Sequence, residues 1–278
     1  MKLTIEDPLG KNRKLVIGLF SVVGLIVILA LTPKPETVED TFHRATDAFN
    51  RGDFQESVEL YDQVLENNPT IASAFQNRGS AKYKLGYYYG ALSDFETAIR
   101  LNPASAESHN SAALACYKTD QEFEALKHAR QALALKPHFA QAFNTLGLIN
   151  YKMNIYSEAI HFFDSAVILN PGYAEAYQNR ALLKSRIGNT YAALSDFATA
   201  IRLKPNFSEA HNNRGLLYFY MKQYPGAVFE FDKAIEINPQ NYNAYFNRGV
   251  VKIKMGERES GKADLAKSKE IRKNLNMY

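Results

Sequence analysis

The sequence lacks several features that identify common classes of protein. It contains no tryptophan, and its single cysteine, Cys116, cannot form an internal disulfide, which excludes a disulfide-stabilised fold. The net charge is only +4, which argues against a dedicated nucleic-acid-binding protein. No HExxH, CxxC, phosphate-loop or dinucleotide-binding glycine pattern occurs. We therefore expect no cofactor, no metal, no small-molecule substrate and no enzymatic activity.

One long apolar run, residues 15–32, lies near the N-terminus. It has no charged residue and would span about 27 Å as a helix, enough for a bilayer core. Basic residues precede it and acidic residues soon follow, so the positive-inside rule places residues 1–14 in the cytoplasm and the rest in the bacterial periplasm. We predict a single-pass anchor; a cleaved signal peptide with soluble export is the alternative. Residues 33–37 form a linker stiffened by two prolines.

The remainder of the chain repeats with a period of 34 residues. A proline recurs at this spacing, at Pro69, Pro103, Pro137, Pro171, Pro205 and Pro239. Each period contains two runs with apolar residues at helical spacing, separated by a glycine or polar residue. An Asn-Pro or Lys-Pro pair ends most of the second helices. A helix of about 13 residues is marginal alone, so neighbouring units must stack to be stable.

Seven units fit the span 38–275. Their predicted bounds are 38–71, 72–105, 106–139, 140–173, 174–207, 208–241 and 242–275. The last unit has Gly261 and Ser268 in its rows of small residues, no terminal proline, and several lysines and arginines in its second helix. We interpret this unit as a polar cap that closes the array. Residues 276–278 form the C-terminal end.

The spacing of Phe143, Leu146, Gly147, Ala159 and Phe163 resembles the tetratricopeptide repeat (TPR). No unit has the tryptophan of that family; Phe, Tyr, His or Thr occupies its position. The resemblance implies an all-α fold, a right-handed α-solenoid of tandem helix–turn–helix repeats, preceded here by one transmembrane helix. It also implies that the first helices of the units line a concave groove of the kind that usually binds extended peptides.

Four units carry an arginine in the first helix and an acid 16 residues later. The pairs are Arg78 with Asp94, Arg180 with Asp196, Arg214 with Glu230, and Arg248 with Asp264. Where the arginine is replaced by Ala112 or Leu146, the acid is replaced by His128 or Phe162. Because arginine and acid occur together, we predict a structural ion pair between the two helices of one unit.

Three rows of residues are candidates for the groove. Asparagine amides can pair with a peptide backbone, or simply tolerate a solvated helix face: Asn77, Asn179, Asn213 and Asn247. Aromatic rings could contact a partner's apolar side chains, or pack between units: Tyr83, Tyr117, Tyr151 and Phe219. Cations could favour an acidic peptide, or complement the ends of helices: Lys84, Lys118, Lys152, Arg186 and Lys254.

The remaining reactive side chains favour structural roles. His109 and His211 occupy the large apolar position of their units, which is typical of core histidines. Cys116 lies on the inward face of a helix and is interpreted as a small core residue.

The function expected from this pattern is protein–protein scaffolding. We predict a membrane-anchored scaffold or adaptor that binds an extended peptide segment of a partner protein, in envelope protein assembly or secretion. Two alternatives stay open at this point. One is a cytosol-facing receptor or co-chaperone, and the other is an accessory subunit that recruits substrate to a separate enzyme. The sequence does not name the partner.

Overall fold

The computed structural model describes residues 36–275. The predicted tail 1–14, the predicted membrane span 15–32, linker residues 33–35 and the end 276–278 lie outside the described residues. Within residues 36–275, no helix is both long and apolar enough to span a bilayer.

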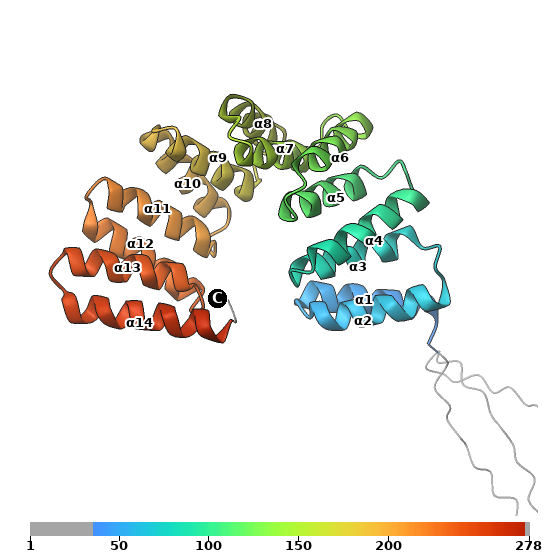
Figure 1. Ribbon diagram of the computed structural model, residues 1–278, viewed down its shortest axis with the longest axis horizontal. Helices are drawn as coiled ribbons and strands as arrows, with labels where there is room; N and C mark the ends of the chain where they lie inside the picture. The colour runs from blue at the N-terminus through green and yellow to red at the C-terminus, as the bar shows by residue number, and fades with distance from the viewer. Residues whose placement is uncertain (1–35, 276–278) are drawn as a thin grey trace, which may run out of the picture.

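Fourteen α-helices and no strands make up the described residues. They are α1 Val38–Arg51, α2 Phe54–Asn67, α3 Ala72–Lys84, α4 Tyr88–Leu101, α5 Ala106–Lys118, α6 Glu122–Leu135, α7 Ala140–Lys152, α8 Tyr156–Leu169, α9 Ala174–Arg186, α10 Thr190–Leu203, α11 Ser208–Tyr220, α12 Tyr224–Ile237, α13 Tyr242–Lys254 and α14 Arg258–Asn274. Odd-numbered helices are therefore the first helices of the units, and even-numbered helices are the second (Figure 1).

Each turn between the two helices of a unit contains one residue with positive φ. Four of these residues are glycines, at φ 83–93°: Gly52, Gly86, Gly188 and Gly256. The other three are Asp120, Asn154 and Lys222, at φ 58–61°. All seven are spaced 34 residues apart, so the repeat fixes the turn geometry even where glycine is absent.

The core of several units is a close approach between a glycine and an aromatic ring. An added Cβ on Gly147 would lie 2.5 Å from Cε1 of Phe163, and one on Gly79 would lie 2.8 Å from Cε1 of Phe95. Both rings are almost fully buried. The absence of a side chain on the first helix therefore makes the space that the ring of the second helix fills.

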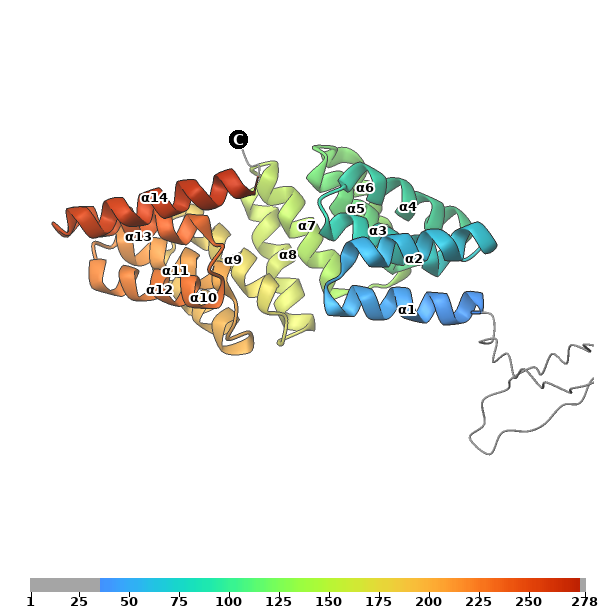
Figure 2. The same cartoon turned by 90° about the horizontal axis from the view of Figure 1, so that it is seen from below.

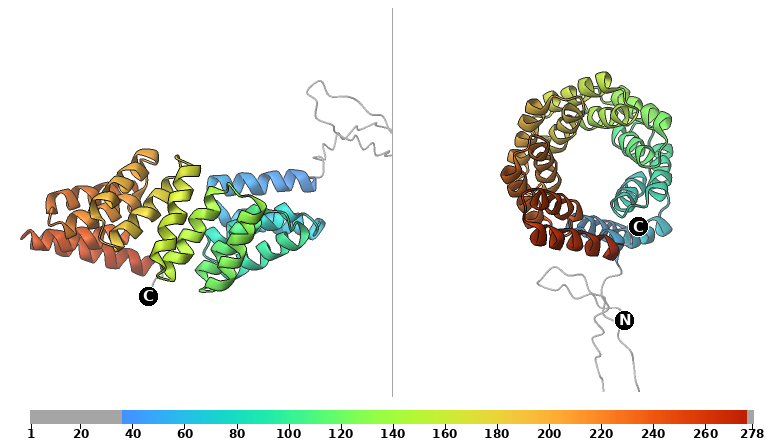
Figure 3. Two further views of the ribbon diagram at one scale, coloured as in Figure 1. Left: turned by 90° about the horizontal axis from the view of Figure 1, so that it is seen from above. Right: turned by 60° about the vertical axis from the view of Figure 1, so that its left-hand side comes forward.

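The stacked pairs form a curved array. First helices of neighbouring units contact each other at every junction, whereas no two second helices make such contacts within residues 36–275. The first helices therefore lie on the inner side of the curve. Figures 1 and 2 show the pairs following one another around a bend, with α1 and α14 at its two ends. In the right-hand view of Figure 3 the array encircles an open centre.

Candidate functional site

The arginines of the first helices bind buried carboxylates on the second helices. Arg180 is a two-pronged example: Nη2 lies 2.7 Å from Oδ1 of Asp196, and Nε lies 2.8 Å from Oδ2. The corresponding Nη2–carboxylate distances in the other three units are 2.5–2.7 Å. The four acids, Asp94, Asp196, Glu230 and Asp264, are at most 6% exposed. These contacts join the two helices of one unit, as the co-occurrence of arginine and acid indicates.

Each buried carboxylate has further partners that the sequence reading missed. In three units a lysine one helical turn after the arginine also contacts the acid: Lys82, Lys184 and Lys252. Burial disfavours the charged form of Asp264, but hydrogen bonds from Arg248 and Lys252 outweigh it and lower the pKa of this carboxyl. Glu230 instead accepts a hydrogen bond from His211 at 2.8 Å, so this histidine belongs to the ion-pair network.

The same arginines also reach the preceding unit. Their Nη1 atoms lie 2.6–2.7 Å from the aspartates that precede them by 16 residues, in the pairs Arg78–Asp62, Arg180–Asp164 and Arg248–Asp232. Arg214 has Ala198 at that spacing, and its Nε is buried without a hydrogen-bond partner among the described residues. The symmetrical spacing of 16 residues in both directions was the signal for these contacts between units.

Unit three replaces the ion pair by two histidines. Nδ1 of His109 lies 3.2 Å from Nδ1 of His128. Burial lowers the pKa of both rings, and for His128 the neighbouring His109 lowers it further. In unit four the same two positions hold the rings of Phe143 and Phe162, 6.4 Å apart. These substitutions keep contact between the helices without a charge.

The predicted asparagine row is engaged in contacts between units. Nδ2 of Asn179 donates to Oδ1 of Asn144 at 2.9 Å, and Nδ2 of Asn247 donates to Oδ1 of Asn212 at the same distance. Asn77 donates to the hydroxyl of Tyr61 at 3.0 Å. Asn213 accepts a hydrogen bond from Asn212 at 3.3 Å. Part of the hydrogen-bonding capacity of this row therefore serves to join neighbouring units.

A second row of amides lies one residue before the first, and the sequence reading missed it. Five consecutive units carry it at a spacing of 34: Gln76, Asn110, Asn144, Gln178 and Asn212. The side-chain oxygens of Gln76, Asn110 and Gln178 are buried and accept no hydrogen bond from any described residue. An unsatisfied buried acceptor is costly and uncommon, so three of them in one row suit a ligand that supplies N–H donors.

The aromatic row packs mainly within its own units. Tyr83, Tyr151 and Phe219 each lie 5.1–6.0 Å from the aromatic ring five residues later, on the second helix. Burial raises the pKa of Tyr83 to about 12. Tyr117 instead contacts Lys152, whose Nζ lies 5.0 Å from the centre of its ring. All four rings stay partly exposed.

The cationic row is not a uniform line of free charges. Lys152 contacts Asp120 and lies 3.0 Å from Glu122, so two carboxylates compensate its charge. Nε of Arg186 lies 3.5 Å from the hydroxyl of Tyr156. Lys118, Arg186, Lys84 and Lys254 are exposed, and none of the four forms an ion pair with a described residue.

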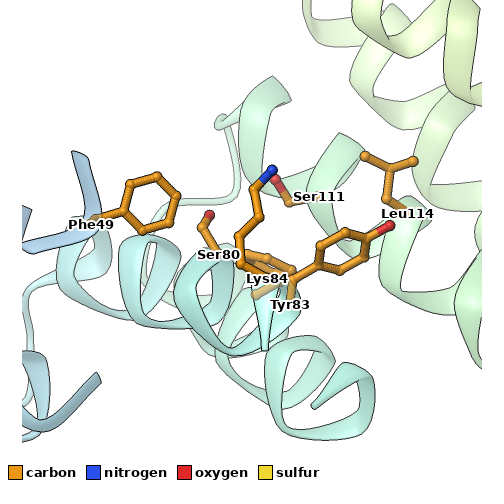
Figure 4. Close-up of a pocket in the computed structure, with 7 residues that line it drawn as sticks. Phe49, Ser80, Tyr83, Lys84, Ser111 and Leu114 are labelled. Atoms are coloured by element: carbon orange, nitrogen blue, oxygen red, sulfur yellow. The ribbon is translucent and has the colours of Figure 1, made fainter. Parts of the chain in front are cut away.

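A pocket of about 240 Å³ lies on the inner side, across units one to three. Its walls are Phe49, Ser80, Tyr83, Lys84, Phe95, Ser111 and Leu114. Figure 4 shows the Lys84 side chain extending toward Ser111, with the Phe49 and Leu114 side chains on either side. The pocket thus combines an apolar surface with one ammonium and two hydroxyl groups. Such a surface can hold an apolar side chain next to an acidic or carbonyl oxygen.

Cys116 and the histidines do not form a reactive centre. Cys116 is 1% exposed, and burial raises the pKa of its thiol to about 11. Within residues 36–275, no three His, Cys, Asp or Glu side chains come together as metal ligands would.

Family models described as tetratricopeptide repeat match most of the chain. The matched residues are 42–88, 72–105, 124–174, 174–207, 208–241 and 230–266. The chain belongs to the tetratricopeptide repeat family. The helix pairs described above are therefore TPR units, and the two amide rows lie on the first helices of the TPR array. A comparison with curated protein sequences finds no match.

Solved structures show the same fold at low sequence identity. A human IFIT1 dimer with PPP-AAAA matches with a TM-score of 0.74 and 18% identity, over 85% of this chain and 60% of the other. A TPR protein from Parabacteroides merdae gives 0.63 and 21%, over 84% and 93%. The APC/C hetero-tetramer Cut9–Hcn1 gives 0.71 and 16%, over 78% of this chain but only 43% of the other. The TPR array here is therefore shorter than two of these chains.

Proposed function

We propose that this TPR protein is a membrane-anchored scaffold that binds an extended segment of a partner protein on the inner surface of the array. TPR folds of this kind are typical of protein-interaction scaffolds. The observation that carries the proposal is the row of unsatisfied amide oxygens on Gln76, Asn110 and Gln178. Backbone N–H groups of an extended chain would satisfy these acceptors whatever the side chains of that chain are.

The pocket adds selectivity to this proposal. It lies beside Gln76, because Ser111 both lines the pocket and accepts a hydrogen bond from Nε2 of Gln76 at 3.0 Å. An apolar side chain of the bound segment would fill the space between Phe49 and Leu114, and Lys84 would attract a neighbouring carboxylate. The preferred segment is therefore an extended one with an apolar residue next to an acidic residue.

A random peptide library displayed on phage, selected against the full chain in detergent, tests the proposal. We expect enriched peptides to bind the native protein and to lose binding when Asn110 is changed to Ala together with Gln76→Ala and Gln178→Ala. The triple variant should be as stable as the native protein or more so, because it removes unsatisfied acceptors.

Asn144→Ala is the matched control. This amide accepts a hydrogen bond from Asn179, so its loss should cost about 1 kcal/mol of stability. The two kinds of variant thus separate binding from stability. Peptide binding that survives the triple substitution would contradict the inner surface as the binding site.

The membrane anchor and its topology belong to this proposal as well. The apolar run 15–32 and the basic residues before it support an N-terminus in the cytoplasm and a periplasmic array, suited to envelope assembly or secretion. Alkaline phosphatase fused after Tyr278 should be active in the bacterial cell, because its disulfides form only outside the cytoplasm. Activity found only in a cytoplasmic reporter at that end would reverse the topology.

A further inference from the structure

Every junction between neighbouring units is built from the same pairs of positions. Counted from the start of each first helix, position 3 shares a hydrophobic cluster with position 28 of the preceding unit. The pairs are Leu65–Ala74, Leu133–Ala142, Val167–Ala176 and Ile201–Ala210. Position 10 in the same way meets position 21 of the preceding unit, in Leu92–Ala115, Ile160–Leu183, Leu194–Leu217 and Val228–Val251.

The two ends of the array carry charges at these junction positions. In the first unit, positions 3 and 10 are Asp40 and Asp47, where the later units have buried small or aliphatic residues at most 5% exposed. In the last unit, positions 21 and 28 are Lys262 and Lys269, where the earlier units are aliphatic. All four charged residues are exposed. Each pair spans seven residues, two helical turns, and therefore lies on one face of its helix.

The opposite signs extend beyond these four residues. Residues 36–67 carry nine acidic and two basic side chains, whereas residues 242–274 carry nine basic and four acidic ones. A polar cap needs only hydrophilic side chains to prevent aggregation of the exposed end. It does not need one sign at one end and the opposite sign at the other, at the positions that join units within the chain. This placement is what an electrostatic match between two ends requires.

We propose that a second copy of the chain docks head to tail, with α1 of one copy on α14 of the next. The first and second helices at a junction pair position 3 with position 28 and position 10 with position 21. Asp40 of one copy then faces Lys269 of the next, and Asp47 faces Lys262. Two first units would bring four aspartates together, and two last units four lysines, so like ends repel and only unlike ends join.

The existing contacts of these residues are compatible with docking. Asp40 accepts hydrogen bonds from Thr37 in the capping box of α1, and this contact lies at the exposed end of the helix. Lys262 lies 2.9 Å from Glu259, in an exposed pair of one helical turn. Exposed pairs of this kind contribute little, so Lys262 can exchange its partner at low cost. Figure 1 shows α1 and α14 as separate ends of the array.

A head-to-tail contact of this kind does not close on itself as a two-fold dimer does. It adds copies one after another, so the average mass should rise with protein concentration rather than stop at a dimer. Because the attraction is between exposed charges, added salt should weaken it.

Sedimentation of the full chain in detergent, at low and high ionic strength, tests the proposal. Asp47→Lys or Lys262→Asp alone should weaken association about tenfold or more, because each places like charges opposite each other. The variant that carries both substitutions should associate as the native chain does. Glu158→Lys, an exposed change of the same charge in the middle of α8, should leave association unchanged.

Disulfide cross-linking gives an independent test of the geometry. Cys116 is 1% exposed, so new cysteines react against a low background. Chains with Asp47→Cys should cross-link with chains that carry Lys262→Cys, and neither should cross-link with itself at a comparable rate. A chain that stays monomeric at every concentration, single reversals without effect, or a double reversal that fails to restore association would each overturn the proposal.

Discussion

Two aspartates that bind the same arginine should differ several-fold in their contribution to stability. Nη2 of Arg180 lies 2.7 Å from Oδ1 of Asp196, and Nη1 lies 2.7 Å from Oδ1 of Asp164. The distances are equal, but the Asp196 side chain is 7% exposed and the Asp164 side chain is 44% exposed. Asp196 also neutralises Lys184, which is itself mostly buried. Burial rather than distance should therefore decide the cost of removing each carboxylate.

The expected magnitudes follow from this difference. Asp196→Ala leaves two largely buried cations without their buried partner, and such a loss costs about 3–5 kcal/mol. Asp164→Ala removes an exposed pair and should cost about 0.2–1 kcal/mol. Both positions lie inside helices, so the change in helix propensity is the same in the two variants.

Denaturant unfolding of the full chain, followed by circular dichroism, measures the two costs. Because an array of repeats need not unfold in one step, amide hydrogen exchange in α9 and α10 should be measured as well. We expect Asp196→Ala to speed exchange there, whereas Asp164→Ala should leave it close to native. Equal destabilisation by the two substitutions would refute the argument that burial sets the value of these ion pairs.

Three further predictions concern the other units. Lowering the pH below about 6.5 should destabilise unit three, since burial lowers the pKa of folded His109 and His128 while the unfolded chain still binds protons; replacing both by Phe should remove this loss. Gly147→Ala should cost about 1–3 kcal/mol, because its Cβ would lie 2.5 Å from an aromatic carbon; Gly90→Ala, with 3.5 Å of space, should stabilise by about 0.5–1 kcal/mol. Cys116 should resist thiol reagents at neutral pH until the chain unfolds, because burial raises its pKa to about 11.

Each of these predictions has a direct measurement. Unfolding curves recorded from pH 7.5 down to about 5 would show the histidine effect, and an unchanged slope in the Phe variant would contradict it. Thermal melts of the two glycine variants should move in opposite directions. Reaction of the native thiol at the rate of an exposed cysteine would show that burial does not protect it.

Much of the fold could be predicted because the repeat places the same residue types at the same positions in successive units. The co-occurrence of arginine and acid was enough to predict Arg180–Asp196, since each partner would be costly alone. The second contact of Arg180, to Asp164, was missed because the reading looked forward along the chain and not back. The family and the all-α solenoid are confirmed by the comparisons.

The candidate site was harder to predict, because side-chain conformation rather than spacing decides it. Tyr83 has the spacing of a groove residue, but its ring packs on Tyr88 of its own unit. Lys152 belongs to a row of cations, but Asp120 and Glu122 compensate its charge across a junction. The buried amide oxygen of Asn110 was not predictable from periodicity, since the neighbouring row has the same spacing.

The ion pairs divide the array into blocks of different stiffness. They cross the junctions between units one and two, three and four, four and five, and six and seven. Within the described chain none crosses α4–α5 or α10–α11, so bending should cost least at these two places. The pocket spans the first of them, with Tyr83 on α3 and Leu114 on α5. A small rotation there would change the width of the pocket, so a segment bound in it would act as a wedge that sets the curvature of the whole array.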